Sequence, residues 1–97
     1  MNVELQDLAQ GFSMLSDPTR LGILKALGKG PKNVSGLCKT LSLNPPTLSH
    51  HLGLLRMGRL VRSARQGKRV FYTIDDSGIG VLASALSRLT GKRRKSL

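Results

Sequence analysis

Residues 44–74 have the sequence NPPTLSHHLGLLRMGRLVRSARQGKRVFYTI, and this stretch decides the fold. Asn44 is a favourable helix N-cap, and Pro45 suits the first helical position because its missing N–H is not needed there. Pro46 is still tolerated in the same first turn. Gly58 is expected to end the helix in a left-handed conformation. The apolar side chains that recur at helical spacing, and that should be buried, are Leu48, Leu52 and Leu55.

Two short strands are predicted to follow this helix, at about Leu60–Ala64 and Val70–Ile74. The connection between them carries several cations, and Gly67 can supply its turn. A capped helix, a glycine stop and a cationic two-stranded hairpin form the layout of a winged helix-turn-helix, whose second helix enters the major groove of duplex DNA.

The remaining chain is predicted to be mainly helical, because apolar residues recur at intervals of three and four. The predicted helices run from about Val3 to Leu15, from Pro18 to a stop at Gly28, from Val34 to Leu41 and from Ile79 to about Thr90. Asp17 and Asn33 are expected to cap the second and third of these helices, and Asp75–Gly78 is expected to be a loop and cap region. The side chains expected to be buried on the second helix are Leu21, Leu24 and Leu27, with Ile23 beside them.

The expected fold class is therefore mainly α with a small β-hairpin, in the order α-α-α-α-β-β-α. One winged helix-turn-helix domain for DNA binding and dimerisation is expected to span residues 1–91, followed by a basic C-terminal tail at 92–97. A chain of 97 residues buries only a modest core, so association between copies would add stability.

The charge of the chain favours a polyanionic partner. Sixteen Lys and Arg against five Asp and Glu give a net charge of +11, which suits nucleic acid first and an anionic membrane surface second. A membrane-surface helix needs Trp or Phe at the boundary, whereas the chain has no Trp and two Phe, so no membrane partner is expected. Glu4 and Asp7 interrupt any signal-peptide run and no apolar stretch could span a bilayer, so a cytoplasmic location is expected.

The start of the second helix of a helix-turn-helix meets the edges of the bases. Short polar side chains let the helix backbone approach the groove and can form hydrogen bonds there. The residues expected to meet the bases are Asn44, Pro46, Thr47, Ser49 and His50, of which Thr47 and His50 share a face with Leu54. Arg56 is expected to reach a phosphate. His51 lies beside the leucine stripe and is expected to be a packed, hydrogen-bonded residue.

The hairpin is expected to follow the phosphate backbone or to enter the adjacent minor groove. Its cationic and polar residues are Arg62, Arg65, Gln66, Lys68 and Arg69. Because side chains alternate across a strand, these residues need not share one face. A charged hairpin that only prevents edge-to-edge pairing is the alternative.

These motifs together resemble the ArsR/SmtB family of bacterial transcriptional repressors. The matching segments are LSDPTRLGILKAL at 15–27, VSGLCKTLSLNPPTLSHHLGLLRMGRLV at 34–61 and VFYTI at 70–74. The family signature has its counterparts in Asp17-Pro18-Thr19-Arg20, Ser49-His50-His51-Leu52, Leu55, Gly58, Leu60-Val61 and Tyr72. The resemblance covers almost the whole domain and implies a sequence-specific DNA-binding regulator.

The resemblance also implies a homodimer built on the terminal helices. The sequence supports this separately, because each terminal helix has an apolar seam that a small domain cannot cover alone. The seams consist of Leu5, Leu8, Phe12 and Leu15 in the first helix and Ile79, Leu82, Leu86 and Leu89 in the last. A two-fold dimer would bind an inverted-repeat operator with half-sites about one helical turn, roughly 34–36 Å, apart.

The sensing sites of known relatives have no counterpart in this sequence. Many relatives bind metal or arsenic through a Cys-x-Cys pattern on the third helix, where this chain has Asn33 and Ser35. Others hold zinc-like ions between the last helices through Asp, His and Glu, and here that helix has no His and acids only at its start. No metal site and no cofactor are therefore expected. Cys38, the single cysteine, is a candidate redox sensor, although a small core residue is the favoured interpretation.

Two other interpretations of the sequence remain open. Charge alone also fits a sequence-neutral architectural or RNA-binding protein, and winged helices also serve as protein-docking modules. An enzyme is not expected, because the chain has only five acids and neither His50 nor His51 has an evident acid partner or nucleophile around it.

Overall fold

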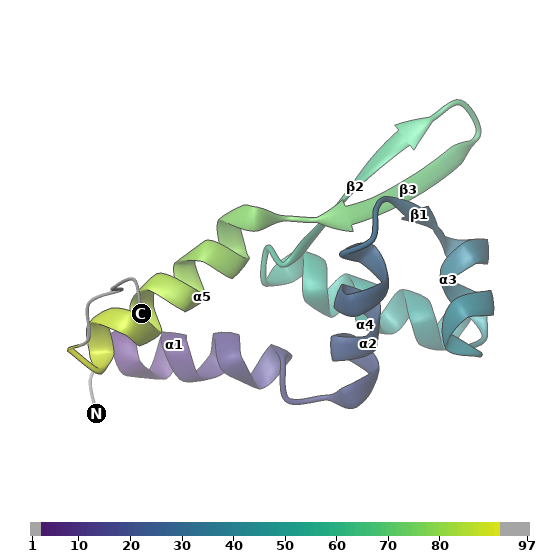
Figure 1. Cartoon of the computed structure of the whole chain (residues 1–97). Coiled ribbons are helices and arrows are strands. Elements are labelled where there is room, and N and C mark those ends of the chain that lie inside the picture. The colour runs from purple at the N-terminus through teal and green to yellow at the C-terminus, as the bar shows by residue number, and fades with distance from the viewer. Residues whose placement is uncertain (1–2, 92–97) are drawn as a thin grey trace.

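The computed structural model describes residues 3–91, which form five helices and three strands (Figure 1). The helices are α1 (Val3–Met14), α2 (Pro18–Leu27), α3 (Val34–Leu41), α4 (Pro45–Met57) and α5 (Asp76–Leu89). The strands are β1 (Lys32–Asn33), β2 (Val61–Gln66) and β3 (Arg69–Ile74). The predicted mainly α fold with a β-hairpin is confirmed, and the predicted basic tail at 92–97 lies outside the described residues.

The strand β1 was not predicted, and it turns the hairpin into a three-stranded antiparallel sheet in the order β1-β3-β2. Lys32 pairs with Tyr72 and Asn33 with Phe71. Two residues are too few to show the alternation of apolar and polar side chains that predicts a strand. The extra pairing makes β3 the central strand, so the hairpin is held to the start of α3 as well as to α4.

The hairpin turn follows directly from the strand register. The pairs run from Val61 and Ile74 to Gln66 and Arg69, which leaves Gly67 and Lys68 as the turn. Gly67 has φ of 64°, a left-handed conformation that glycine adopts without steric cost, so its predicted role is confirmed. Both strands are longer than predicted, and β2 continues to Gln66 instead of ending at Ala64.

The core is built around one face of α4. The predicted stripe Leu48, Leu52 and Leu55 is confirmed, and each of these side chains is at most 1% exposed. The other buried residues of the cluster are Ile23, Ala26, Leu27, Leu37, Leu60 and Val61. The prediction for α2 is confirmed for Ile23 and Leu27, and Leu24 is partly buried against the core. It was wrong for Leu21, which is 49% exposed because α3 and α4 pack on the side that carries Ile23 and Ala26.

Asparagine and aspartate side chains cap three of the helices. Asn44 Oδ1 accepts the Thr47 N–H at 2.9 Å and Asn33 Oδ1 accepts the Gly36 N–H at 2.8 Å, so both asparagine caps are confirmed. Asp75 Oδ1 accepts the Ser77 N–H at 3.0 Å, and this cap starts α5 at Asp76 instead of at Ile79.

The end of α4 differs from the prediction. Gly58 has φ of −82° and is not left-handed, whereas the next residue, Arg59, has φ of 58°. The Arg59 carbonyl oxygen accepts the Gly78 N–H at 3.0 Å, and the Leu60 N–H donates to the Leu55 carbonyl oxygen at 2.9 Å. These two hydrogen bonds stabilise a conformation that a non-glycine residue rarely adopts.

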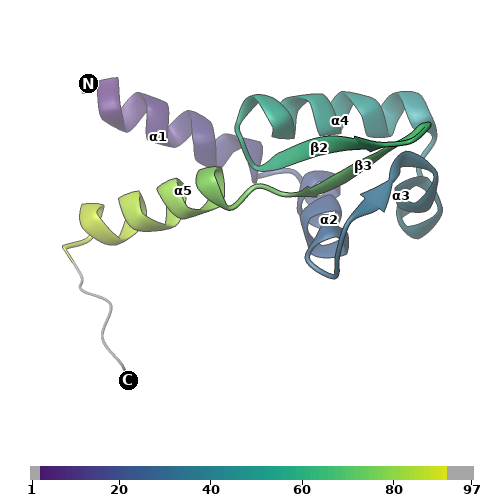
Figure 2. The same cartoon turned by 90° about the horizontal axis from the view of Figure 1, so that it is seen from above.

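The terminal helices α1 and α5 lie side by side and extend together away from the other elements (Figures 1 and 2). We call this pair the arm, and we call residues 17–74 the head. Gly78 lies where the arm meets the head. A Cβ added at Gly78 would overlap the Arg59 carbonyl and would lie 2.8 Å from the Gly58 carbonyl oxygen.

We expect Gly78→Ala to lower the free energy of unfolding by about 1–3 kcal/mol or more, as overpacked sites do, measured by urea denaturation. Gly80→Ala is the matched control in the same helix, because a Cβ there meets nothing within 4 Å. The control should leave stability unchanged or raise it by about 0.5–1 kcal/mol, since alanine is the better helix former. Equal stability of the two variants would contradict the close approach.

Candidate nucleic-acid interface

The helix α4 runs along one edge of the molecule, with β2 and β3 beside it (Figure 2). The predicted contact residues on and before it are all exposed; they are Asn44, Pro46, Thr47, Ser49, His50 and Arg56. Leu54, expected to share their face, is half-buried. Asn44 Oδ1 is engaged in the helix cap, so only its amide hydrogens remain to donate outward. The polar start of α4 is therefore accessible without rearrangement.

His51 belongs to a polar cluster that was not predicted. Its Nδ1 lies 3.4 Å from Asp17 Oδ2 and 3.3 Å from Arg20 Nη1, so the expectation that neither histidine has an acid partner was wrong. Asp17 was expected to cap α2, but its carboxylate makes no cap hydrogen bond and turns toward His51 and Arg20 instead. Arg20 and Asp17 lie 31 and 34 positions before His51, so no local sequence pattern connects them to it.

The cluster ties three segments together. Arg20 Nε donates to the Met14 carbonyl oxygen at 2.7 Å, which joins α2 to the end of α1. Because Arg20 can only donate and the Asp17 carboxylate accepts, His51 Nδ1 cannot satisfy both groups at once. Asp17 Oδ2 is buried and has no hydrogen-bond partner among the described residues. His51 in turn touches the exposed His50 ring in an edge contact, with ring centroids 5.6 Å apart.

The hairpin, which we call the wing, presents cations on both of its faces. The pairing places Arg62 and Gln66 on one face together with Arg69, whereas Arg65 lies on the opposite face. Lys68 occupies the turn beside Gly67. All five of these predicted contact residues are exposed. The structure therefore places Arg62, Gln66 and Arg69 on one face, with Gln66 and Arg69 directly paired and Arg62 toward the other end of β2, and it separates Arg65 from them.

The head contains no acid beyond Asp17 at its first position. The segment from Pro18 to Ile74 has no Asp or Glu. Its cations are Arg20, Lys25, Lys29, Lys32, Lys39, Arg56, Arg59, Arg62, Arg65, Lys68 and Arg69. The other acids lie in α1 or at the start of α5. Such a separation of charge creates a positive field around α4 and the wing, which attracts a polyanion.

Asp75 stands where the wing returns to the arm. The Ser77 hydroxyl donates to Asp75 Oδ1 at 2.6 Å and the Ser77 backbone N–H at 3.0 Å. These hydrogen bonds, helped by the charges of Arg62 and Arg59, lower the pKa of Asp75 below its ordinary value. An ionised Asp75 stabilises the start of α5 through the helix dipole, and it partly offsets the charge of Arg62 at the base of the wing.

Most of the exposed large apolar side chains lie in the arm. Of the exposed large hydrophobic residues in the described chain, four are in the arm: Leu5 (41%), Val81 (65%), Leu86 (46%) and Leu89 (57%). The remaining predicted seam residues, Leu8, Phe12, Leu15, Ile79 and Leu82, are half-buried. A groove of about 500 Å³ runs between the two helices and is lined partly by Leu5, Leu82 and Leu89.

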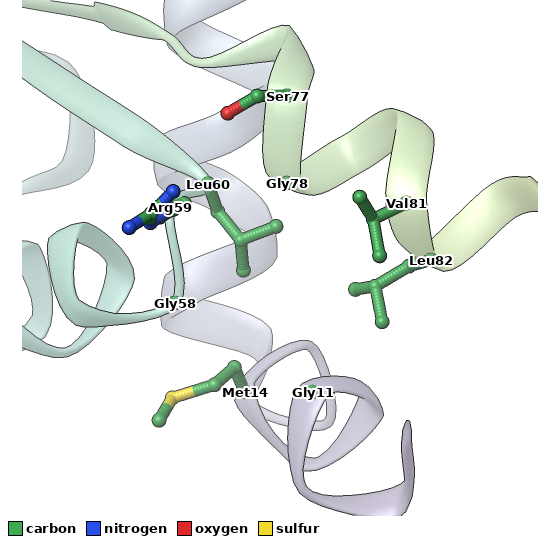
Figure 3. A pocket seen from close by; sticks show the side chains of 9 residues that line it. All are labelled: Gly11, Met14, Gly58, Arg59, Leu60, Ser77, Gly78, Val81 and Leu82. Atoms are coloured by element: carbon green, nitrogen blue, oxygen red, sulfur yellow. The ribbon is translucent and has the colours of Figure 1, made fainter. Parts of the chain in front are cut away.

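A smaller pocket of about 200 Å³ lies at the junction of arm and head (Figure 3). Met14, Leu60 and Leu82 line it from α1, the α4–β2 connection and α5. Gly78 also lines it, so the close approach described above forms part of its wall. The pocket is separate from the exposed surface of α4.

Cys38 is half-buried and packs against the hydrophobic core. Within residues 3–91, no group of three His, Cys, Asp or Glu side chains is arranged to hold a metal ion. None of the described helices is both long enough and apolar enough to cross a membrane.

Known bacterial regulators are similar to this chain in sequence. The family described as "Bacterial regulatory protein, arsR family" matches residues 17–63. The HTH-type transcriptional regulator Rv2034 of Mycobacterium tuberculosis is 34% identical over 79 residues, which are 81% of this chain and 74% of the relative. The chain spans only 58% and 52% of the length of two other relatives, which are also regulators.

Solved structures of similar chains superpose over nearly the full length. An ArsR-like transcriptional regulator from Rhodococcus sp. RHA1 has a TM-score of 0.83 at 29% identity and covers 93% of this chain and 85% of its own. The homodimeric winged helix-turn-helix DNA-binding domain of Mb0332 from Mycobacterium bovis has a TM-score of 0.70 at 27% identity, covering 97% and 93%.

The polar start of α4, the cationic wing and a head without acids after Asp17 thus occur on a chain that shares both sequence and fold with these regulators. The protein belongs to the arsR family of bacterial regulatory proteins.

Proposed function

We propose that the protein is a transcriptional repressor that binds duplex DNA sequence-specifically as a homodimer, acting in the cytoplasm. The observation that carries the proposal is the capped and exposed start of α4, which lies beside a cationic wing in a head whose positions 18–74 contain no acid. An exposed helix of this kind fits the major groove, and flanking cations neutralise phosphates.

The proposed contacts divide into two kinds. Thr47, Ser49 and His50 contact base edges, because they lie on the exposed first turns of α4. Arg56 and the cations of the wing contact phosphates. Arg62 and Arg69 share one face of the wing and would follow one strand of the backbone, whereas Arg65 would reach from the opposite face.

The homodimer is proposed from the arm. Leu86 and Leu89 are large apolar side chains with about half of their surface exposed, which is costly for a monomer in water. A solved neighbour of the same fold is described as homodimeric. A two-fold axis through the arms would present two copies of α4 to an inverted repeat, with half-sites roughly 34–36 Å apart.

Selection of binding sites from random duplexes, followed by footprinting, tests the proposal as a whole. The selected sites should contain an inverted repeat, and the footprint should have two-fold symmetry. Equal binding to every duplex would instead favour a sequence-neutral nucleic-acid-binding protein.

We expect His50→Ala to weaken binding to the selected operator by about 5- to 100-fold for each half-site, since one base contact in each subunit contributes roughly 1–3 kcal/mol. Binding to scrambled duplex should change little, because the phosphate contacts remain. Ser84→Ala, an exposed position of α5 away from the apolar seam, serves as the control in the same mobility-shift titration. Unchanged discrimination between operator and scrambled DNA would rule out base contact by His50.

The wing variants Arg65→Ala and Lys68→Ala should weaken binding to every duplex to a similar degree. Each should reduce the slope of log K against log salt by about 2 for the dimer, because one phosphate contact is lost in each of its two subunits. The slope is measured by fluorescence anisotropy over a salt series, with Lys25→Ala in α2 as the control. Slopes equal to that of the unmodified protein would show that the wing does not touch the backbone.

For the arm, we expect Leu86→Glu to convert the protein to a monomer, because a carboxylate would replace an apolar contact across the seam. Operator affinity should also fall, because a monomer presents only one copy of α4. Sedimentation equilibrium gives the mass, and Ser84→Glu on the exposed side of α5 is the matched control. A Leu86→Glu variant that remains dimeric would place the interface elsewhere.

A further inference from the structure

The outward face of α4 is an uncharged ridge. At 100° per residue, the positions opposite the buried Leu48, Leu52 and Leu55 are Pro46, His50, Gly53 and Met57, and all four are exposed. Met57 is 78% exposed, the most exposed large apolar side chain of the described chain. Arg56, the one cation of α4, lies to the side of this ridge.

Gly53 has no role inside the protein that requires glycine. It lies in the interior of α4, is exposed, and has no positive φ. An added Cβ would meet nothing within 4 Å. Glycine in a helix interior is less stable than alanine, so the missing side chain weakens α4 without any packing benefit within residues 3–91. The space above Gly53 is therefore available to a partner that approaches α4 closely.

The space above Gly53 forms a shallow hollow, which is lined by Ser49, His50, Gly53, Leu54, Arg56 and Met57. Its walls are more apolar than polar. The helix has no Asn, Gln or Lys, and the side-chain oxygen Oδ1 of Asn44, which precedes the helix, already accepts the Thr47 N–H. The paired donor and acceptor of an amide, which identify adenine in the major groove, are thus missing from the ridge. The apolar group that a base pair offers there is the 5-methyl of thymine.

We propose that the hollow at Gly53, between His50 and Met57, receives the methyl group of a thymine in each half-site. The inference rests on the proposed function, since it needs α4 to lie in the major groove. The positive head brings the polyanion to α4, and the ridge then adds an apolar contact to the base contacts proposed for Thr47, Ser49 and His50. Gly53 allows the approach because it presents no side chain.

Deoxyuridine substitution in the selected operator is the direct test. Deoxyuridine keeps every hydrogen-bonding group of thymine and lacks only the methyl. Symmetric pairs of thymines are replaced one pair at a time, and the dissociation constant is measured by fluorescence anisotropy. One pair should weaken binding about fourfold per half-site, the value expected for one buried methyl-sized group. Thymines outside the half-sites serve as the internal control.

The variant Gly53→Ala fills the hollow and should lower operator affinity at least as much as one deoxyuridine pair does. The melting temperature of the variant should stay the same or rise. The same deoxyuridine pair should then have no further effect, because both changes remove one contact. Gly80→Ala makes the same substitution in α5, where an added Cβ also meets nothing within 4 Å, and should leave the affinity and the deoxyuridine response unchanged.

The outcomes separate this inference from the proposed function. A protein that selects an inverted repeat but responds to no deoxyuridine pair would overturn the thymine contact alone. Gly53→Ala with unchanged operator affinity would do the same. Weaker binding by Gly53→Ala without any deoxyuridine effect would indicate close approach of the sugar-phosphate backbone and would also overturn it. A protein without sequence preference would overturn the proposed function, and the hollow with it.

Discussion

The burial of one face of α4 is the constraint on which the rest of the structure depends. Leu48, Leu52 and Leu55 are at most 1% exposed and hold the helix at a single rotation about its axis. Truncation of a buried leucine costs about 2–5 kcal/mol, a large part of the stability of a small domain. The same packing directs the opposite face outward. The spacing of the leucines therefore sets both the stability of the head and the direction in which the ridge faces.

The rotation of α4 is linked to the arm by polar contacts. Arg20 binds the carbonyl at the end of α1 and lies against Asp17 and His51, so one small cluster connects α1, α2 and α4. In the other helix of the arm, the Gly78 N–H donates to the Arg59 carbonyl oxygen directly after α4. If two arms associate, these contacts set the distance and angle between the two copies of α4, and hence the spacing of half-sites.

The sequence predicts those features that depend on local spacing. The asparagine caps, the Gly67 turn and the leucine face of α4 each follow from a pattern within a few residues. The features that were missed depend on contacts between distant segments. Asp17 leaves its capping role because His51, 34 positions later, lies beside it. Arg59 takes the left-handed conformation expected of Gly58 because its carbonyl binds Gly78. Leu21 is exposed because two other helices pack against the far side of α2, and β1 exists only as a partner of β3.

In the proposed complex, the distribution of charge assigns affinity for DNA and discrimination between binding sites to different surfaces. The proposed phosphate contacts of the wing would release counterions and would be similar on every sequence, so they would not distinguish operators. The outward ridge of α4 carries no charge, so it would attract DNA little over a distance and would act only through direct contact with base pairs. In the proposed complex, the uncharged ridge and the missing side chain at Gly53 make the fit of base pairs against α4 the quantity that separates one site from another.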